Sequence, residues 1–210
     1  MNRKLTILGA GESGVGAALL GKAKGYDVFV SDHGSIGNKY RTELKEAGID
    51  FEEGKHSEER ILKSDLVIKS PGIPDTTPLI KSLRSKGNLI ISEIEFAGKY
   101  TDAKLIGITG TNGKTTTTLL TYHILKEAGF NVGVAGNIGK SFARQVLTES
   151  HDWYVLELSS FQLDGTFNFA PHIAILTNLS PDHLDRYGND YDKYIDSKFK
   201  IIMNQTSDDY

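Results

Sequence analysis

Short apolar runs alternate with longer amphipathic stretches in the N-terminal part of the chain. The short runs are typical of buried strands, and the longer stretches are typical of helices that cover a sheet. We therefore expect strands over residues 5–8, 27–31, 66–69 and 89–91, and helices over residues 13–24, 39–47 and 79–86. Strands that alternate with helices in this way predict a parallel sheet with right-handed crossover connections.

A break over residues 92–102 is followed by a second pattern of the same kind. Here we expect strands over residues 105–109, 132–135, 153–158 and 173–178, and helices over residues 114–128 and 191–203. A polar tail, QTSDDY, ends the chain. The pattern predicts two consecutive α/β units, over residues 1–92 and 93–210.

The first expected strand runs into a glycine-rich loop, Gly9-Ala10-Gly11-Glu12-Ser13-Gly14, which fits GxGxxG and opens a helix. Glycines at this spacing let the backbone approach a diphosphate, and the helix N-terminus supplies amide donors. Asp32 ends the second strand, where its carboxylate can accept hydrogen bonds from a sugar or base. The loop indicates a diphosphate-bearing nucleotide more firmly than NAD, although a tight turn that binds nothing would fit it too.

A second turn of small residues, Ser70-Pro71-Gly72-Ile73-Pro74, follows another expected strand. In an open parallel sheet the ligand crevice lies at the carboxyl ends of the strands. This turn can therefore line the same crevice, or it can be an ordinary Pro-Gly turn.

The second unit opens with a P-loop between its first strand and first helix, at residues 110–116. Backbone amides of such a loop surround phosphates, the side chain of Lys114 reaches the β- and γ-phosphate oxygens, and the hydroxyl of Thr115 can bind Mg²⁺. The loop departs from strict GxxxxGK[ST] spacing, because Ile108 stands at the first glycine position.

Two later segments are candidates for the metal contacts that a P-loop needs. Glu157 ends an apolar strand, and a carboxylate at that end of the sheet would face the phosphates. The next strand leads into the sequence SPDHLD, residues 180–185, which places His183 between two acids at the same edge. We expect both segments to contact metal or phosphate.

Composition removes several classes of protein. With 24 basic and 27 acidic side chains the net charge is −3, which argues against a nucleic-acid-binding protein. The chain has no cysteine, which excludes a disulfide scaffold, a thiolate metal site and a cysteine nucleophile. No apolar run approaches 18 residues and the start shows no signal-peptide pattern, so we expect a cytoplasmic protein without membrane contact.

The strings SPGIP, GTNGKTTTT, GNIG, LELSSFQL, NLSPDHLDRY and YDKYIDSKFK occur in this order over essentially the whole chain. Together they closely resemble the Mur ligases of bacterial peptidoglycan synthesis. SPGIP and ELSSFQL are similar to the member that adds D-glutamate to UDP-N-acetylmuramoyl-L-alanine. The resemblance implies a three-domain ligase: a Rossmann-like UDP-binding domain, a P-loop ATPase domain and a C-terminal domain for the amino acid. This chain would hold the first domain and about half of the second.

The resemblance also implies a mechanism, in which the L-alanyl carboxylate attacks the γ-phosphate of ATP and the D-glutamate amine then attacks the acyl phosphate. Two Mg²⁺ ions would be held by Thr115, Glu157, His183 and a carbamylated Lys198. ATP would contact Gly110, Thr111, Asn112, Gly113, Lys114, Thr115 and Thr116, and Lys114, His183 and Lys198 would be the catalytic residues. The UDP-linked substrate would lie along Glu12, Ser13, Asp32, Ser70, Pro71, Gly72, Asn137, Ser159, Gln162 and His183.

Some residues stay open at this point. Without the resemblance, Lys198 reads as one of several lysines on a solvated helix. After Asp32 the chain continues with His33 and Gly34, so no arginine is available there for the base or the phosphate. Which of Asp182, Asp185 and Arg186 acts directly, and which shapes the loop, also stays open.

Other classes of protein compete with this interpretation. Another Mur ligase or a folylpolyglutamate synthase would share GTNGKT, but a folate enzyme has no use for a UDP-binding first domain. A non-catalytic NAD-binding module would fit the first loop, and a P-loop switch protein would fit the second, although no guanine-reading NKxD sequence is present. As a monomeric piece of a ligase, the chain would bind ligands without catalysing the reaction.

Overall fold

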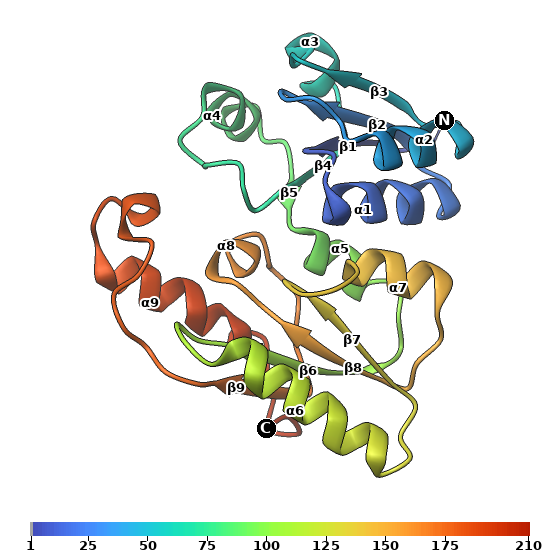
Figure 1. The fold of residues 1–210 in the computed structure, drawn as a ribbon. Coiled ribbons are helices and arrows are strands. Elements are labelled where there is room, and N and C mark those ends of the chain that lie inside the picture. The colour runs from blue at the N-terminus through green and yellow to red at the C-terminus, as the bar shows by residue number, and fades with distance from the viewer. Residues whose placement is uncertain (1) are drawn as a thin grey trace.

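The computed structural model describes residues 2–210, and its first sheet lies in the N-terminal part of the chain (Figure 1). This parallel sheet has the strand order β3-β2-β1-β4-β5 and consists of β1 Lys4–Leu8, β2 Asp27–Asp32, β3 Asp50–Glu53, β4 Leu66–Lys69 and β5 Ile90–Ile91. Its helices are α1 Glu12–Ala23, α2 Asn38–Glu46, α3 Glu58–Ile61 and α4 Pro78–Ser85. The strand order reverses between β1 and β4, and ligands bind open sheets at such a point.

The second sheet is also parallel, with the order β7-β8-β6-β9. It consists of β6 Lys104–Thr109, β7 Val132–Gly136, β8 Trp153–Glu157 and β9 Ile173–Leu176, with helices α5 Glu93–Gly98, α6 Lys114–Glu127, α7 Phe142–Thr148, α8 Ser160–Leu163 and α9 Tyr191–Phe199. Two 3₁₀ turns, Leu184–Tyr187 and Lys200–Ile202, flank α9. Ile108 of β6 is paired with Glu157 of β8, so the P-loop and this carboxylate lie at the same edge. None of the helices within residues 2–210 has the length and apolar character needed to cross a bilayer.

The α/β class and every expected strand and helix are confirmed, with ends shifted by a few residues. Sequence reasoning missed five elements: β3, α3, α5, α7 and α8. The expected break over residues 92–102 contains α5, whose N-terminus is capped by the Ser92 hydroxyl accepting from the backbone N–H of Glu95. The helix expected to reach residue 203 ends at Phe199 and tightens into a 3₁₀ turn. The polar tail is not free either, because Tyr210 pairs with the backbone of His172 and Ala174 beside β9.

The two sheets are joined by a packed seam between α1 and α7, with α5 alongside (Figure 1). One apolar core cluster contains residues of both units, among them Val15 of α1 and Phe142 of α7. Across the seam Arg144 of α7 donates from Nε to Glu12 (2.7 Å) and pairs through Nη1 with Glu43 (2.8 Å). The seam holds the first sheet against the second. The boundary at residues 92 and 93 stays a prediction.

Glu93, at the start of α5, is buried in this seam. One carboxylate oxygen accepts a hydrogen bond from the backbone N–H of Ala143, while the other has no partner among residues 2–210. Burial raises the pKa of Glu93 to about 7, although the backbone donors of α7 oppose the rise. The protonated form is therefore favoured by folding.

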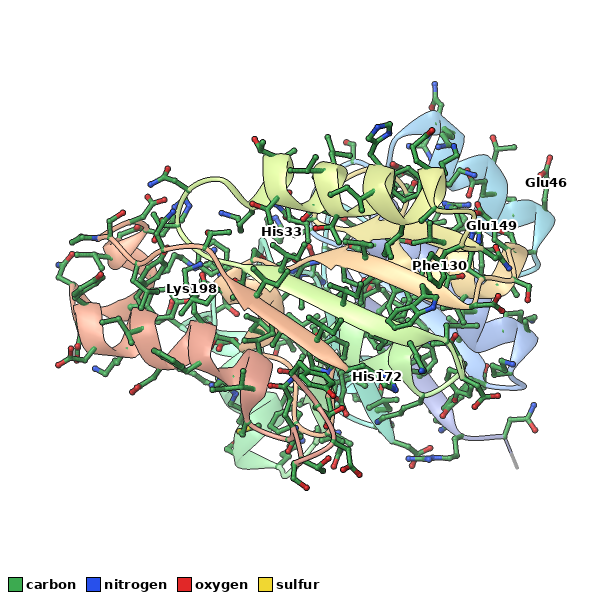
Figure 2. All side chains as sticks on the ribbon, turned by 90° about the horizontal axis from the view of Figure 1, so that it is seen from below. His33, Glu46, Phe130, Glu149, His172 and Lys198 are labelled. Carbon is green, nitrogen blue, oxygen red and sulfur yellow. The ribbon has the colours of Figure 1, made fainter. Side chains whose placement is uncertain are left out.

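We expect Glu93→Gln to make the free energy of unfolding less dependent on pH. The stability that protonated Glu93 contributes is complete below pH 4.5, where the unfolded chain also holds the proton, and is lost as the pH rises to 7. At about 1.4 kcal/mol per pKa unit, the variant should gain about 3 kcal/mol over the wild type at pH 8 and nothing at pH 4. Urea unfolding at both pH values measures this, with exposed Glu46→Gln as the control (Figure 2). Parallel pH profiles for wild type and Glu93→Gln would contradict it.

Candidate functional site

A cavity of about 580 Å³ lies at the carboxyl ends of β1, β2 and β4. It is lined by the loop after β1 (Gly9 and Gly11), by Asp32 and His33, by His56, and by the turn that contains Ser70 and Gly72, among others. The volume is within the range that small-molecule ligands occupy. The structure thus brings the two predicted glycine-containing turns to one cavity.

Asp32 orders this cavity through its backbone contacts. One carboxylate oxygen accepts from the backbone N–H of Ala10 (2.7 Å), and the other accepts from that of Gly34 (2.7 Å). Gly9 has a φ of +94°, and a Cβ there would lie 2.7 Å from the Cβ of Ser70. Only glycine lets these two turns approach so closely.

Two histidines that sequence reasoning left unassigned border the same cavity. The ring of His33 (Figure 2) lies 5.8 Å from that of His56, and Nδ1 of His56 is 2.7 Å from the hydroxyl of Ser31. Burial and the neighbouring His33 lower the pKa of His56. These rings stand where the sequence offers no arginine.

The P-loop begins at the end of β6 and leads into α6. Gly110 has a φ of +143°, and a Cβ there would lie 2.0 Å from the hydroxyl of Thr177, so the loop requires glycine at this position. The ammonium of Lys114 donates to the carbonyls of Gly110 (3.0 Å) and Thr111 (2.9 Å). The loop therefore surrounds the ammonium of Lys114, which phosphate oxygens could also bind.

Glu157 lies beside the first turn of α6. It is 2% exposed, and its carboxylate accepts from the hydroxyl of Thr115 (2.7 Å) and from the amide of Asn137 (2.9 Å). Hydroxyl and carboxylate oxygens are the ligands that Mg²⁺ prefers, so Thr115 and Glu157 fit the ion by their chemistry. Within residues 2–210 no three His, Asp or Glu side chains gather in a group able to hold a metal ion.

Lys198 is buried on the inner side of α9 (Figure 2) and is only 2% exposed. The interpretation of Lys198 as a solvated lysine, drawn from the sequence alone, is therefore wrong. Its ammonium donates to the carbonyl of Gly110 (2.8 Å) and lies 4.7 Å from the ring centre of Tyr194. Burial, and then the charge of Lys114, lower the pKa of Lys198 to about 8.

A second cavity, of about 260 Å³, joins these groups to the first unit. Its lining includes Pro71, Gly72, Lys114, Asn137, Ser159, His183 and Lys198. His183 has a φ of +49° at the start of a 3₁₀ turn, and its Nε2 lies 3.5 Å from the carboxylate of Asp182. Sequence reasoning missed Phe161 and Tyr194, which line the same cavity.

Other predicted residues take different positions. Ser159 and Gln162 form a capping box at the start of α8, with each side chain bonded to the backbone N–H of the other. The carboxylate of Glu12 is engaged with Arg144 in the seam, and neither Glu12 nor Ser13 lines either cavity. Substrate contacts by Glu12 and Ser13 stay predictions.

Comparisons with known proteins agree with this arrangement. The MurD N-terminal domain model matches residues 4–78, and the Mur ligase middle domain model matches residues 108–210. The UDP-N-acetylmuramoylalanine–D-glutamate ligase of Bacteroides fragilis is 62% identical over 207 residues, which are 99% of this chain and 47% of that protein. The protein of the same name from Christiangramia forsetii is 57% identical over all of this chain and 47% of its own length. The chain thus spans about half the length of these relatives.

Solved structures share the fold. A ligase from Neisseria meningitidis, UDP-N-acetylmuramate:L-alanyl-gamma-D-glutamyl-meso-diaminopimelate ligase, has a TM-score of 0.65 at 23% identity, covering 99% of this chain and 69% of its own. The UDP-N-acetylmuramate-alanine ligase MurC of Thermotoga maritima has a TM-score of 0.58 at 27% identity, covering 94% and 46%. Mur ligase domain models match both units, and relatives that are 57–62% identical match nearly the whole chain. The chain therefore belongs to the Mur ligase family.

Proposed function

We propose that this chain is the substrate-binding and ATP-binding part of an ATP-dependent, ADP-forming ligase that adds D-glutamate to UDP-N-acetylmuramoyl-L-alanine. The observation that carries the proposal is the second cavity, where Lys114, His183 and Lys198 meet Pro71 and Gly72 of the first unit. A substrate held in the first cavity could present its carboxylate there. The names of the Bacteroides and Christiangramia relatives support the choice of substrates.

The chain's own residues would position ATP and the UDP-linked substrate and neutralise the charge of the phosphates. ATP supplies the phosphoryl group that turns the unreactive substrate carboxylate into an acyl phosphate. Lys114 and the amides of residues 110–116 would hold the phosphate oxygens, and Thr115 and Glu157 would hold a Mg²⁺ ion. His183 would face a second ion from across the cavity.

Lys198 is suited to carbamylation, because the reaction with CO₂ requires a neutral amine. Its lowered pKa increases the neutral fraction, and its burial beside Lys114 disfavours a second cation. A carbamate would replace that cation with anionic oxygens that bind metal. We propose this state for the active enzyme.

The whole ligase should need more than residues 1–210. The relatives are about twice as long, and we expect the D-glutamate site and further ATP contacts in the part that this chain does not cover. By itself the chain should bind ligands without turnover. A cytoplasmic, monomeric ligase stays our prediction.

Calorimetric titration with UDP-N-acetylmuramoyl-L-alanine tests the first cavity. The wild-type chain should bind it and should not bind NAD. Asp32→Ala removes two charge-assisted bonds that order residues 10 and 34, so we expect binding at least about tenfold weaker. Asp27→Ala, an exposed aspartate at the opposite end of the same strand, is the matched control and should bind normally. Binding of NAD without the UDP-sugar would overturn the proposed function in favour of a dinucleotide module.

A further inference from the structure

The turn of residues 70–74 forms a wall between the two cavities. Gly72 lines both of them, Ile73 and Pro74 face the first, and Pro71 faces the second. A ligand that extends from the first cavity to Lys114 must therefore pass along this turn. The position of the turn sets how the two cavities are aligned.

Arg186, in the 3₁₀ turn after β9, reaches across from the second unit to this wall. Its Nη2 donates to the carbonyl of Pro71 (3.0 Å) and lies 3.5 Å from that of Ile73. Its guanidinium carbon lies 4.3 Å from the ring centre of Phe161. Within residues 2–210 Arg186 forms no ion pair with a carboxylate, so its charge is balanced by the ring and by the backbone of the first unit.

The same turn is held from its own side by Lys69. This side chain is 12% exposed, donates to the carbonyl of Ile73 (2.7 Å) and pairs with Asp75 (3.3 Å). Two cations from different units thus bind neighbouring carbonyls of one turn. Within residues 2–210 Arg186 is the only residue of the second unit that hydrogen-bonds to this turn, so without it every hydrogen bond to the turn would come from the first unit.

Phe161 connects this contact to the metal side of the second cavity. The ring of His183 lies 5.4 Å from that of Phe161, which also packs against the guanidinium of Arg186 and stacks with the ring of Tyr187. His183 and Arg186 also belong to one short loop. The residues that hold the turn of residues 70–74 therefore also position His183.

We propose that Arg186 is a positioning residue, which straps residues 70–74 to the second unit and thereby aligns the substrate with the phosphate site. The strap itself is independent of the ligand, whereas its effect on substrate rests on the proposed function. In this role Arg186 shapes the substrate site by binding backbone carbonyls of the first unit.

Hydrogen exchange of the ligand-free chain tests the strap directly. In Arg186→Ala the amides of Ile73 and Thr77, which donate to the carbonyls of Ser70 and Pro74, should exchange about tenfold faster, because a charge-assisted bond no longer resists local opening. Arg186→Lys should fall between, because lysine can reach a carbonyl but cannot stack its planar group on Phe161. Unchanged exchange in both variants would show that Arg186 does not hold the turn of residues 70–74 in place.

Arg60→Ala is the matched control. Arg60 also lies over a phenyl ring, that of Phe29 (3.7 Å), but both belong to the first unit, and they line a cavity that contains no residue of the turn. This variant should leave exchange at Ile73 and Thr77 unchanged. If Arg186→Ala fails to fold by circular dichroism, Arg186→Lys and Phe161→Leu carry the same test.

Calorimetry separates positioning from general damage. Arg186→Ala should raise the Kd for UDP-N-acetylmuramoyl-L-alanine about tenfold and leave the Kd for Mg·ATP within about twofold. Equal weakening of both ligands, or of neither, would overturn the positioning role. If the wild-type chain does not bind the UDP-sugar, the proposed function fails, and the exchange experiment still decides the strap.

Discussion

Replacing Lys114 by methionine should lower kcat of the full-length ligase by about a thousandfold or more, the largest effect that we expect from one side chain. Its ammonium is held at the entrance of α6 by the carbonyls of Gly110 and Thr111, so it is already placed where the transferred phosphoryl group would lie. Methionine keeps the length of the side chain but removes the charge. We expect loss of turnover and weaker Mg·ATP binding, measured by phosphate release and by calorimetry.

The matched control is Lys126→Met in the last turn of the same helix, where the ammonium lies 5.4 Å from the ring centre of Tyr122. It should keep wild-type kcat. A Lys114→Met enzyme that retains more than about a tenth of the wild-type rate would contradict a role for Lys114 in phosphoryl transfer.

The second large effect should come from Lys198. Alanine at this position would remove the buried amine that we propose to carry a metal-binding carbamate, and we expect kcat to fall by about a hundredfold to a thousandfold. With its pKa lowered to about 8, about a tenth of the amine is neutral at pH 7 and available to CO₂. Removing dissolved CO₂ and bicarbonate should therefore lower the activity of the wild type, and adding bicarbonate should restore it.

Two variants decide between a carbamate and a simple cation at this position. Lys198→Arg keeps a positive charge near the carbonyl of Gly110 but cannot form the carbamate, so it should be as inactive as Lys198→Ala. Exposed Lys193→Ala on the same helix should be fully active. If the Lys198→Arg enzyme is active and its rate does not change with bicarbonate, the site requires the positive charge itself and not a carbamate.

The local part of the fold could be predicted from sequence because its signals are local. Apolar runs mark all strands except β3, which lies at the sheet edge and whose sequence DFEE has three acidic residues out of four. The short helices α3 and α8 have four residues each, too few for a periodic pattern to show. Gly110 and Gly113 could be placed by their spacing, since a P-loop is a continuous segment.

Lys198 shows what could have been found and was not. Four buried residues in and just after α9 follow the i, i+3, i+4, i+7 spacing of one helix face: Tyr194, Ser197, Lys198 and Ile201. A lysine on the same stripe as Tyr194 and Ile201 was a sign of a buried amine. A count of charged residues along the helix hides that stripe.

Contacts between the two units had no such signal. Arg144 and Glu12 are 132 positions apart, and Arg186 and Pro71 are 115 apart. Each pair depends on how two sheets pack, and one sequence does not reveal that. The roles of Arg144, Arg186 and the buried Glu93 could be described only with the structure.

The close approach of α1 to α7 at Gly16 limits how freely the two units can be exchanged between members of the family. A Cβ on Gly16 would lie 2.0 Å from the hydroxyl of Ser141, which in turn caps α7. The helix that begins at the nucleotide-type loop is thus shaped to one particular partner helix. A chimera that joins this first unit to the second unit of another Mur ligase family member should misassemble unless α7 is transplanted with it, so useful recombination points lie beyond residue 148.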